Sequence, residues 1–218
     1  MTPTATPIEV VAAVILQPDG QFLLTRRPQG KIYSGYWEFP GGKVESGESL
    51  HHAIARELWE ELGIHVRQAY PWITRTFTYT HATVRLHFFR IVSWENQPIA
   101  REQQELIWQQ PGHITVSPIL PANDPILQAL RLPTIFAITH AFETGLESAY
   151  QQIEWAFKNG VRLWQIREKQ MPEARLQDFT EKVLQMARPY DARVLINGSE
   201  VLAQKFGTNG IHLTATRL

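Results

Sequence analysis

Three glutamates close together carry the strongest chemical signal in this chain. Glu57, Glu60 and Glu61 fall at i, i+3 and i+4 of a helix predicted over residues 49–62, so their carboxylates share one face. Like charges this close repel one another unless a cation lies between them. Mg²⁺ takes hard oxygen ligands and bridges readily to phosphates. The spacing therefore indicates a divalent-cation site that acts on a phosphorylated molecule, although an isolated Glu-x-x-Glu-Glu is more often a solvated helix face.

Neighbouring residues strengthen the metal interpretation. Arg56 is placed to hold one carboxylate through a bidentate contact, and Glu48 lies near the helix start, where the helix dipole favours negative charge. Gly41 and Gly42 allow a tight turn before the helix, so that a backbone carbonyl can join the metal shell. The opposite helix face carries the predicted core residues Ile54, Leu58 and Leu62.

The stretch from Gly42 to Ile64 resembles the complete signature of the Nudix hydrolases. A glycine and five free positions precede Glu48, and seven more positions lead to Arg56-Glu57-Leu58-x-Glu60-Glu61-x-Gly63-Ile64. The resemblance implies a metal-dependent enzyme that cleaves a diphosphate linkage, with Mg²⁺ as its cofactor and Mn²⁺ as the alternative. It also implies metal ligands at Gly42, Glu57, Glu60 and Glu61.

Within that family, residues 8–132 look most like the MutT-type enzymes, which hydrolyse oxidised nucleoside triphosphates. This resemblance implies that Arg27 and Lys43 contact phosphate and that Phe39 lines the base pocket. Arg27 as a plain surface arginine and Phe39 as a plain core residue stay open as the alternatives.

Two loop residues extend the match. Glu102, in Arg-Glu-Gln-Gln-Glu, falls where the family places an additional metal-binding glutamate, with Glu105 as a nearby competitor. Asn123 lies in Pro-Ala-Asn-Asp-Pro, which resembles the family's base-recognition segment. Asp124 is predicted to cap the helix that follows, with Pro125 at its first turn, which leaves the Asn123 amide free. A donor and an acceptor together suit the edge of an oxidised guanine, whereas a turn asparagine is the plainer alternative.

The expected reaction converts 8-oxo-dGTP to 8-oxo-dGMP and pyrophosphate, with Arg56, Glu57 and Glu102 as catalytic residues. Either Glu57 or Glu102 accepts the proton, and the sequence does not choose between them. Three other functions stay open: hydrolysis of another nucleoside diphosphate derivative such as ADP-ribose, an added thiamine phosphate synthase activity, and non-catalytic nucleotide sensing.

Composition narrows the setting. The 218 residues carry a formal net charge of zero, which argues against a general nucleic-acid-binding surface. The absence of cysteine excludes disulfides, thiolate zinc sites and cysteine nucleophiles. The apolar run Ile8–Leu16 contains Glu9 and is too short to span a bilayer, so we expect a strand there and a soluble cytoplasmic protein without membrane contact.

The chain is predicted to divide near Leu132-Pro133 into domains over 1–132 and 133–218. The first is expected to be an α+β sandwich with a mixed sheet. It should contain a hairpin of strands 8–16 and 21–25 across Pro18-Asp19-Gly20, and further strands over 74–79 and 83–94. In the second, strand patterns at 134–139, 162–168, 193–197 and 210–213 alternate with helices at 146–158, 172–188 and 200–206. This α/β alternation predicts a parallel sheet.

Residues 134–214 resemble the thiamine phosphate synthase family, a TIM barrel. Gln165, Arg167 and Lys169 are expected to face one side of a strand and, with Asn197, to form a vestigial anion site. Gly198 stands where the family has an aspartate, Thr214-Ala215-Thr216 supplies no second aspartate, and about four of the eight strand–helix units are present. We therefore expect an inactive appendage whose open sheet edges are shielded by the first domain or by a second copy in a homodimer.

Overall fold

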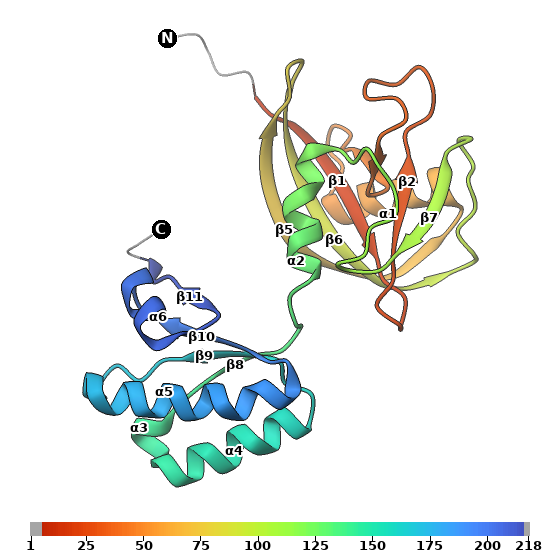
Figure 1. The fold of residues 1–218 in the computed structure, drawn as a ribbon. Coiled ribbons are helices and arrows are strands. Elements are labelled where there is room, and N and C mark those ends of the chain that lie inside the picture. The colour runs from red at the N-terminus through yellow and green to blue at the C-terminus, as the bar shows by residue number, and fades with distance from the viewer. Residues whose placement is uncertain (1–5, 216–218) are drawn as a thin grey trace, which may run out of the picture. The chain divides into compact units, whose positions relative to one another are not determined.

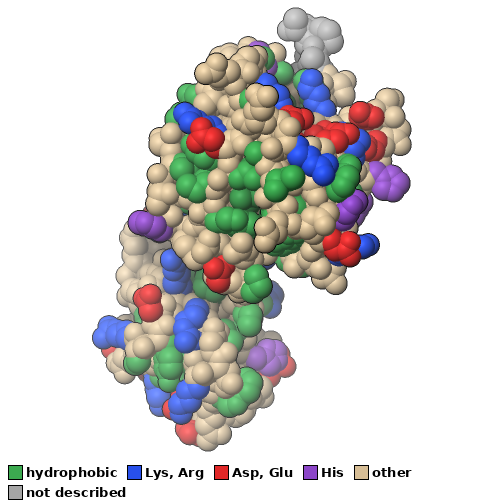
Figure 2. All heavy atoms as spheres, turned by 90° about the vertical axis from the view of Figure 1, so that its right-hand side faces the viewer, with side chains coloured by type: hydrophobic (Ala, Val, Ile, Leu, Met, Phe, Trp, Pro, Cys, Tyr) green, Lys and Arg blue, Asp and Glu red, His purple; other side chains and the backbone are tan. Residues whose placement is uncertain are grey.

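The structure is a computed structural model that describes residues 6–215. These residues form two compact units, divided between Arg131 and Leu132 (Figure 1). No helix in the described range is long and apolar enough to cross a membrane. On the face drawn in Figure 2, acidic and basic side chains are interspersed with one another and with apolar and neutral ones.

The first unit is a sandwich of two sheets with two α-helices. One sheet is mixed, with β1 parallel to β6 and the other pairs antiparallel. Its order is β4 (Gly41–Lys43), β1 (Ile8–Ile15), β6 (Thr83–Glu95) and β5 (His65–Thr78). The second sheet is antiparallel, in the order β3 (Trp37–Glu38), β2 (Phe22–Arg26) and β7 (Glu105–Gln109). The helices are α1 (Leu50–Leu62), a 3₁₀ turn η1 (Pro121–Asn123) and α2 (Asp124–Leu130).

Strand β1 is the centre of this unit because both of its faces are buried. Val11, Ala13 and Ile15 pack in the apolar cluster under α1, whereas Ala12 and Val14 pack in the cluster that contains α2. Side chains alternate between the two faces of a strand, so a strand covered on both faces reads as a continuous apolar run. This explains the pattern from which the strand was predicted.

Helix α1 begins and ends where local signals place it. Ser49 caps its start by accepting the His52 N–H at 3.2 Å, and Gly63 ends it with φ 68°, a left-handed conformation that suits glycine. The buried residues Ala53, Ile54, Leu58 and Leu62 follow the helical period. The predicted helix and its core face are confirmed.

The predicted hairpin is confirmed only next to its turn, where Leu16 and Phe22 form an antiparallel bridge, and is wrong for the rest of the two strands. Strand β1 pairs with β4 and β6, while β2 pairs with β3 and β7, so the turn after β1 carries the chain from one sheet to the other. The two strands meet only at their ends, where the Gln17 N–H donates to the Gln21 carbonyl. The turn residues predict a reversal correctly, but the strand partners are set by contacts distant in sequence.

The predicted cap at Asp124 is also wrong. Asp124 is the first residue of α2, and Asn123 precedes it with near-helical angles (φ −87°, ψ −20°) and no side-chain capping bond. The 3₁₀ turn η1 leads directly into the helix, since the Asp124 N–H donates to the Pro121 carbonyl. The predicted strand over 74–79 is the end of the longer β5, and β7 was not predicted.

The second unit is a parallel sheet with helices between successive strands. Its sheet order is β11 (Gly210–His212), β10 (Arg193–Asn197), β9 (Leu163–Ile166) and β8 (Phe136–Ile138). The helical elements are α3 (Ala141–Thr144), α4 (Leu146–Lys158), α5 (Glu173–Ala187), η2 (Arg188–Tyr190) and α6 (Glu200–Phe206). One strand face packs with the helices in a single core, which includes Trp164, Ile166, Val194 and Phe157. The predicted fold class is confirmed for both units.

The other face of this sheet is partly open. Phe136 and Ile138 on β8 are 39% and 51% exposed. The Phe136 ring lies 5.7 Å from the ring of His212, although β8 and β11 are the outer strands of the four. The sheet is therefore curled, as in a segment of a barrel.

The fold predicts that position 41 tolerates no side chain. Gly41 has φ 143°, and an added Cβ would lie 2.2 Å from the Val11 carbonyl oxygen in β1. We expect Gly41→Ala to lower the free energy of unfolding by more than the cost of a strained backbone position alone, which is about 1–3 kcal/mol, because the added Cβ also collides with β1. Urea unfolding measures it. Gly47→Ala is the control, because Gly47 also has positive φ (79°) but meets nothing within 4 Å. Equal losses in the two variants would contradict the steric argument.

Candidate active site

One pocket of about 590 Å³ gathers most of the residues singled out in the first unit. Glu57 and Glu61 come from α1, Glu102 from the loop before β7, and Gly42 and Lys43 from β4. Its other lining side chains are more varied and include Arg27, Lys31, Glu38, Phe39, Tyr79, Leu86, Leu120 and Asn123. Acidic, basic, apolar and amide groups therefore share one cavity.

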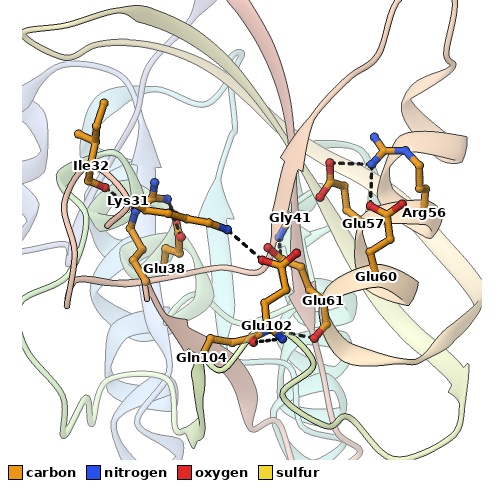
Figure 3. A network of polar contacts seen from close by, with 11 residues as sticks. Lys31, Ile32, Glu38, Gly41, Arg56, Glu57, Glu60, Glu61, Glu102 and Gln104 are labelled. Atoms are coloured by element: carbon orange, nitrogen blue, oxygen red, sulfur yellow. Dashed lines mark hydrogen bonds and ion pairs between the residues drawn. The ribbon is translucent and has the colours of Figure 1, made fainter. Parts of the chain in front are cut away.

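Arg56 organises the carboxylates beside this pocket. Its Nε and Nη2 donate to the two oxygens of Glu48, both at 3.0 Å, and Nη2 also donates to the Lys43 carbonyl at 3.0 Å. Its Nη1 donates to Glu57 at 2.9 Å and to Glu60 at 3.0 Å (Figure 3). These bonds raise the pKa of Arg56 and, with a backbone bond from Glu45, lower that of Glu48. The bidentate contact that the sequence predicts for Arg56 is made with Glu48.

Glu57 lies directly against the backbone of Gly42. A Cβ added at Gly42 would stand 2.4 Å from the Glu57 carboxyl group, so only glycine leaves room for it. The Glu57 side chain is 15% exposed. Burial raises its pKa, against the opposing effect of the Arg56 hydrogen bond. The glycine turn and α1 thus hold a carboxylate and a backbone segment in close contact.

Glu61 is a strongly perturbed carboxyl group of the site. It accepts the Gly41 N–H at 3.1 Å, yet burial raises its pKa to about 8. The charges of Glu38, Glu57 and Glu102 raise the pKa further. This part of the pocket therefore has more negative than positive charge.

Glu102 is paired with a lysine that the sequence did not single out. Lys31 Nζ lies 2.9 Å from Glu102, and this hydrogen bond raises the pKa of Lys31. The competing residue Glu105 pairs instead with Arg26 at 2.6 Å and does not line the large pocket. Of the two glutamates, the structure therefore places Glu102 with the α1 carboxylates.

Arg27 lies in the pocket, but a carboxylate holds it. Its Nη1 stands 2.6 and 2.7 Å from the two oxygens of Glu38, and its Nε donates to the Ile32 carbonyl at 2.8 Å. Burial raises the pKa of Glu38 even with Arg27 beside it. The sequence analysis did not single out Glu38. A glutamate between two large aromatic residues, Trp37 and Phe39, which are both buried, could have indicated a carboxylate held close to the core.

Asn123 and Phe39 form a different part of the lining. Asn123 is 4% exposed, and within the described residues its Nδ2 has no hydrogen-bond partner. Phe39 is 3% exposed and packs against Phe22 and Phe88, with ring centroids 5.7 and 5.8 Å away. Phe39 is thus both a core residue and a pocket residue, so the two interpretations of it are compatible.

The pocket suits a divalent cation chemically, although its carboxylates are engaged by basic side chains. No group of three His, Asp or Glu side chains in residues 6–215 is gathered closely enough to hold a metal. Glu60 does not line the pocket and stays with Arg56, while Glu102 stays with Lys31. The remaining donors are all hard oxygens, the ligand type that Mg²⁺ prefers, and burial raises the pKa values of Glu57 and Glu61. These residues fit a magnesium-type ion.

The predicted anion site of the second unit is only partly assembled. Gln165 donates to Asn197 at 3.0 Å, and Asn197 and Lys169 line a cavity of about 260 Å³. Strand β9 ends at Ile166, so the prediction that Arg167 and Lys169 share a strand face with Gln165 is wrong. Arg167 is exposed and outside this cavity. Glu168, which was not predicted, is buried and accepts the N–H groups of Ala141 and Phe142 at 2.7 and 2.8 Å.

Comparison with known proteins finds a family model that matches each segment. The model of the NUDIX domain matches residues 11–129, and that of thiamine monophosphate synthase matches residues 135–218. The chain is 38% identical over 122 residues to a CTP pyrophosphohydrolase of Escherichia coli, which covers 56% of this chain and 90% of that protein. It is 34% identical over 123 residues to an 8-oxo-dGTP diphosphatase of Haemophilus influenzae, with the same coverage.

Solved structures agree with this assignment. The MutT Nudix hydrolase of Burkholderia pseudomallei has a TM-score of 0.53 at 26% identity, covering 56% of this chain and 97% of that one. The MutT protein of Methanosarcina mazei has a TM-score of 0.51 at 31% identity, covering 58% and 94%. With its MutT-like first unit joined to a segment similar to thiamine phosphate synthase, the chain belongs to the Nudix family of hydrolases, which act on diphosphate linkages.

Proposed function

We propose that the first unit hydrolyses 8-oxo-dGTP to 8-oxo-dGMP and pyrophosphate with the help of Mg²⁺. The observation that carries this proposal is the buried amide nitrogen of Asn123, which has no hydrogen-bond partner among residues 6–215 and lies in the same pocket as Glu57, Glu61 and Glu102. A buried donor without a partner is costly in a free protein, so it favours a ligand that supplies an acceptor. The relatives named 8-oxo-dGTP diphosphatase support the same substrate.

The proposed base site combines the Asn123 amide with apolar surface. An oxidised guanine presents carbonyl oxygens that accept from Nδ2 and N–H groups that donate to the amide oxygen. Phe39 and Leu86 supply apolar contacts for the flat base. Arg27, Lys31 and Lys43 line the same pocket and are the proposed contacts of the triphosphate, whose charge can draw Lys31 from Glu102.

Glu57, Glu61, Glu102 and the Gly42 carbonyl would hold the metal ion. Glu60 would join them only after exchanging its bond to Arg56. When bound, a divalent cation offsets phosphate charge and makes water a stronger acid. We assign proton acceptance to Glu102, because Glu57 is fixed between Arg56 and Gly42 whereas Glu102 is 43% exposed on a loop. Arg56 then acts by orienting Glu57.

A second candidate function is hydrolysis of a pyrimidine nucleoside triphosphate. The 38% identical relative named CTP pyrophosphohydrolase favours it. Two assays separate the candidates. One measures release of pyrophosphate from 8-oxo-dGTP, dGTP and CTP, and the other measures release of AMP from ADP-ribose. We expect the highest kcat/KM with 8-oxo-dGTP. A higher value with CTP would replace the proposed substrate, and preference for ADP-ribose would remove nucleoside triphosphates from the proposal.

Replacing one carboxylate tests the metal site. Glu57→Gln keeps the shape and removes one pocket charge, so we expect kcat to fall by at least about 10²-fold with Mg²⁺. The melting temperature should stay equal or rise slightly, because repulsion with Glu61 is relieved. Glu105→Gln is the control, since Glu105 does not line this pocket. Turnover near the wild-type value in Glu57→Gln would refute the proposed role.

Removing the Asn123 side chain tests base recognition. Asn123→Ala should reduce the preference for 8-oxo-dGTP over dGTP by about 1–3 kcal/mol, the worth of a good bidentate base contact. The ratio of the two kcat/KM values measures it. The kcat of saturating dGTP should change much less. If both nucleotides lose equally, Asn123 shapes the loop and does not read the base.

Truncation tests the division of labour between the units. We propose that the second unit makes no thiamine phosphate, because Gly198 stands where the resembled family has a metal-binding aspartate. A chain ending at Arg131 should keep the nucleotide kcat/KM within about twofold, since the described pocket is lined only by residues 8–123. A coupled condensation assay on the full chain should give no product. Synthesis at an enzymatic rate, or a folded but inactive truncated chain, would overturn this division.

A further inference from the structure

The loop of residues 96–104 is bound to the last turn of α1 by a series of hydrogen bonds. The N–H groups of Ile99 and Arg101 donate to the carbonyls of Leu62 and Glu61, both at 3.0 Å. The Asn96 side chain donates to the Gly63 carbonyl at 3.2 Å. Carbonyls at a helix C-terminus have no partner within the helix, so this loop supplies partners that the helix lacks.

Gln104 makes the contact that matters most for the pocket. It is 7% exposed, its Nε2 donates to the Glu61 carbonyl at 2.8 Å, and its Oε1 accepts the Glu102 N–H at 2.8 Å. Figure 3 shows this amide next to both glutamates. A single side chain therefore joins the backbones of the two residues whose carboxylates enter the pocket from the helix and from the loop.

The position of Glu102 depends on these backbone contacts. Its own carboxylate is paired with Lys31, and both side chains are about half exposed, so the pair contributes little positional energy. Arg101 adds support from the other side, with its guanidinium 4.2 Å from the centre of the Trp59 ring and a bond to the Trp59 carbonyl at 3.0 Å. The backbone of Glu102 is thus held while its side chain stays free to change partner.

We propose that Gln104 is a positioning residue, which fixes Glu102 relative to Glu61 so that both carboxylates can hold one divalent cation. The proposal rests on the proposed metal-dependent function and deepens it. Gln104 does not line the pocket, so it acts through the two glutamates and not by touching substrate. Partners of this kind typically change metal affinity or activity by about 10–100-fold.

Gln109 offers a matched control within the same unit. It is also a buried glutamine, 3% exposed, and its Oε1 accepts the Thr115 N–H at 2.6 Å while its Nε2 donates to Thr115 Oγ1 at 3.0 Å. It lies on β7 and does not line the pocket. Gln104→Met and Gln109→Met each replace a buried amide by an apolar side chain of similar length. We expect the two variants to lose similar amounts of melting temperature, so a difference in their metal binding does not come from stability.

The experiment measures Mn²⁺ binding to the full chain without nucleotide, by the loss of the free-ion electron paramagnetic resonance signal. We expect Gln104→Met to weaken Mn²⁺ binding by at least about tenfold, and Gln109→Met by less than about twofold. Backbone hydrogen exchange at Glu102 should accelerate only in Gln104→Met, because that N–H loses its acceptor. Gln104→Glu keeps the acceptor for Glu102 but loses the donor to Glu61, and it should weaken Mn²⁺ binding as well.

The outcomes separate this proposal from the one on which it rests. Wild-type Mn²⁺ binding that is unchanged in Gln104→Met would overturn the positioning role and leave the metal site standing. Loss of the fold in Gln104→Met but not in Gln109→Met would show a structural role and would also overturn it. A wild-type chain that binds no Mn²⁺ would overturn both. With saturating metal, the expected pattern is a lower kcat for 8-oxo-dGTP with KM within about twofold, since no substrate contact is removed.

Discussion

The arrangement of the site depends on the guanidinium of Arg56. It donates to three carboxylates, Glu48, Glu57 and Glu60, and to the Lys43 carbonyl, so that it ties α1 to the loop before it and to β4. Hydrogen bonds between charged partners are stronger than neutral ones, and this one guanidinium compensates several like charges at once. The negative charges can therefore gather only because this cation is among them. Glu61, which Arg56 does not reach in these bonds, is the carboxyl group whose pKa rises to about 8.

What could be predicted from the sequence was local. The helical period of Ala53, Ile54, Leu58 and Leu62, with Ser49 before and Gly63 after, predicts α1 because each signal acts within a few residues. The strand–helix alternation after Pro133 was equally readable. The pairing of β1 could not be predicted in this way. Strand β6, more than seventy positions further along the chain, takes the place beside β1 that the predicted hairpin gave to β2. Lys31 and Gln104 were missed for the same reason, since each acquires its role from a partner that only the fold brings near.

The second unit shows a similar limit at the end of a strand. Alternating side chains predicted that Gln165, Arg167 and Lys169 share a face, and this holds only while the strand continues. Thr139 Oγ1 accepts the Arg167 N–H, and the Met171 N–H donates to the Glu168 carbonyl in the turn that follows. These bonds end the ladder after Ile166, and Arg167 is exposed whereas Gln165 is buried. The resemblance to a barrel family predicts the fold of the segment correctly, but it does not place each of its polar residues.

The pocket of the first unit carries two local costs in the free chain. A Glu61 pKa raised from 4.5 to about 8 means that the folded chain holds a proton which the unfolded chain releases above pH 4.5. The unfolding free energy therefore falls as pH rises through that window, up to about pH 8. The Asn123 nitrogen, which has no partner in the described part of the chain, adds a desolvation cost of about 1–3 kcal/mol. A divalent cation would remove the first cost and a base acceptor the second. Each ligand would then stabilise the folded state by an amount that grows with the logarithm of the ratio of its concentration to its dissociation constant. The raised pKa of Glu61 and the buried Asn123 nitrogen are both unfavourable for folding. A metal ion would relieve the first and a nucleotide base the second. This is the physical reason to assign the two groups to function and not to the core.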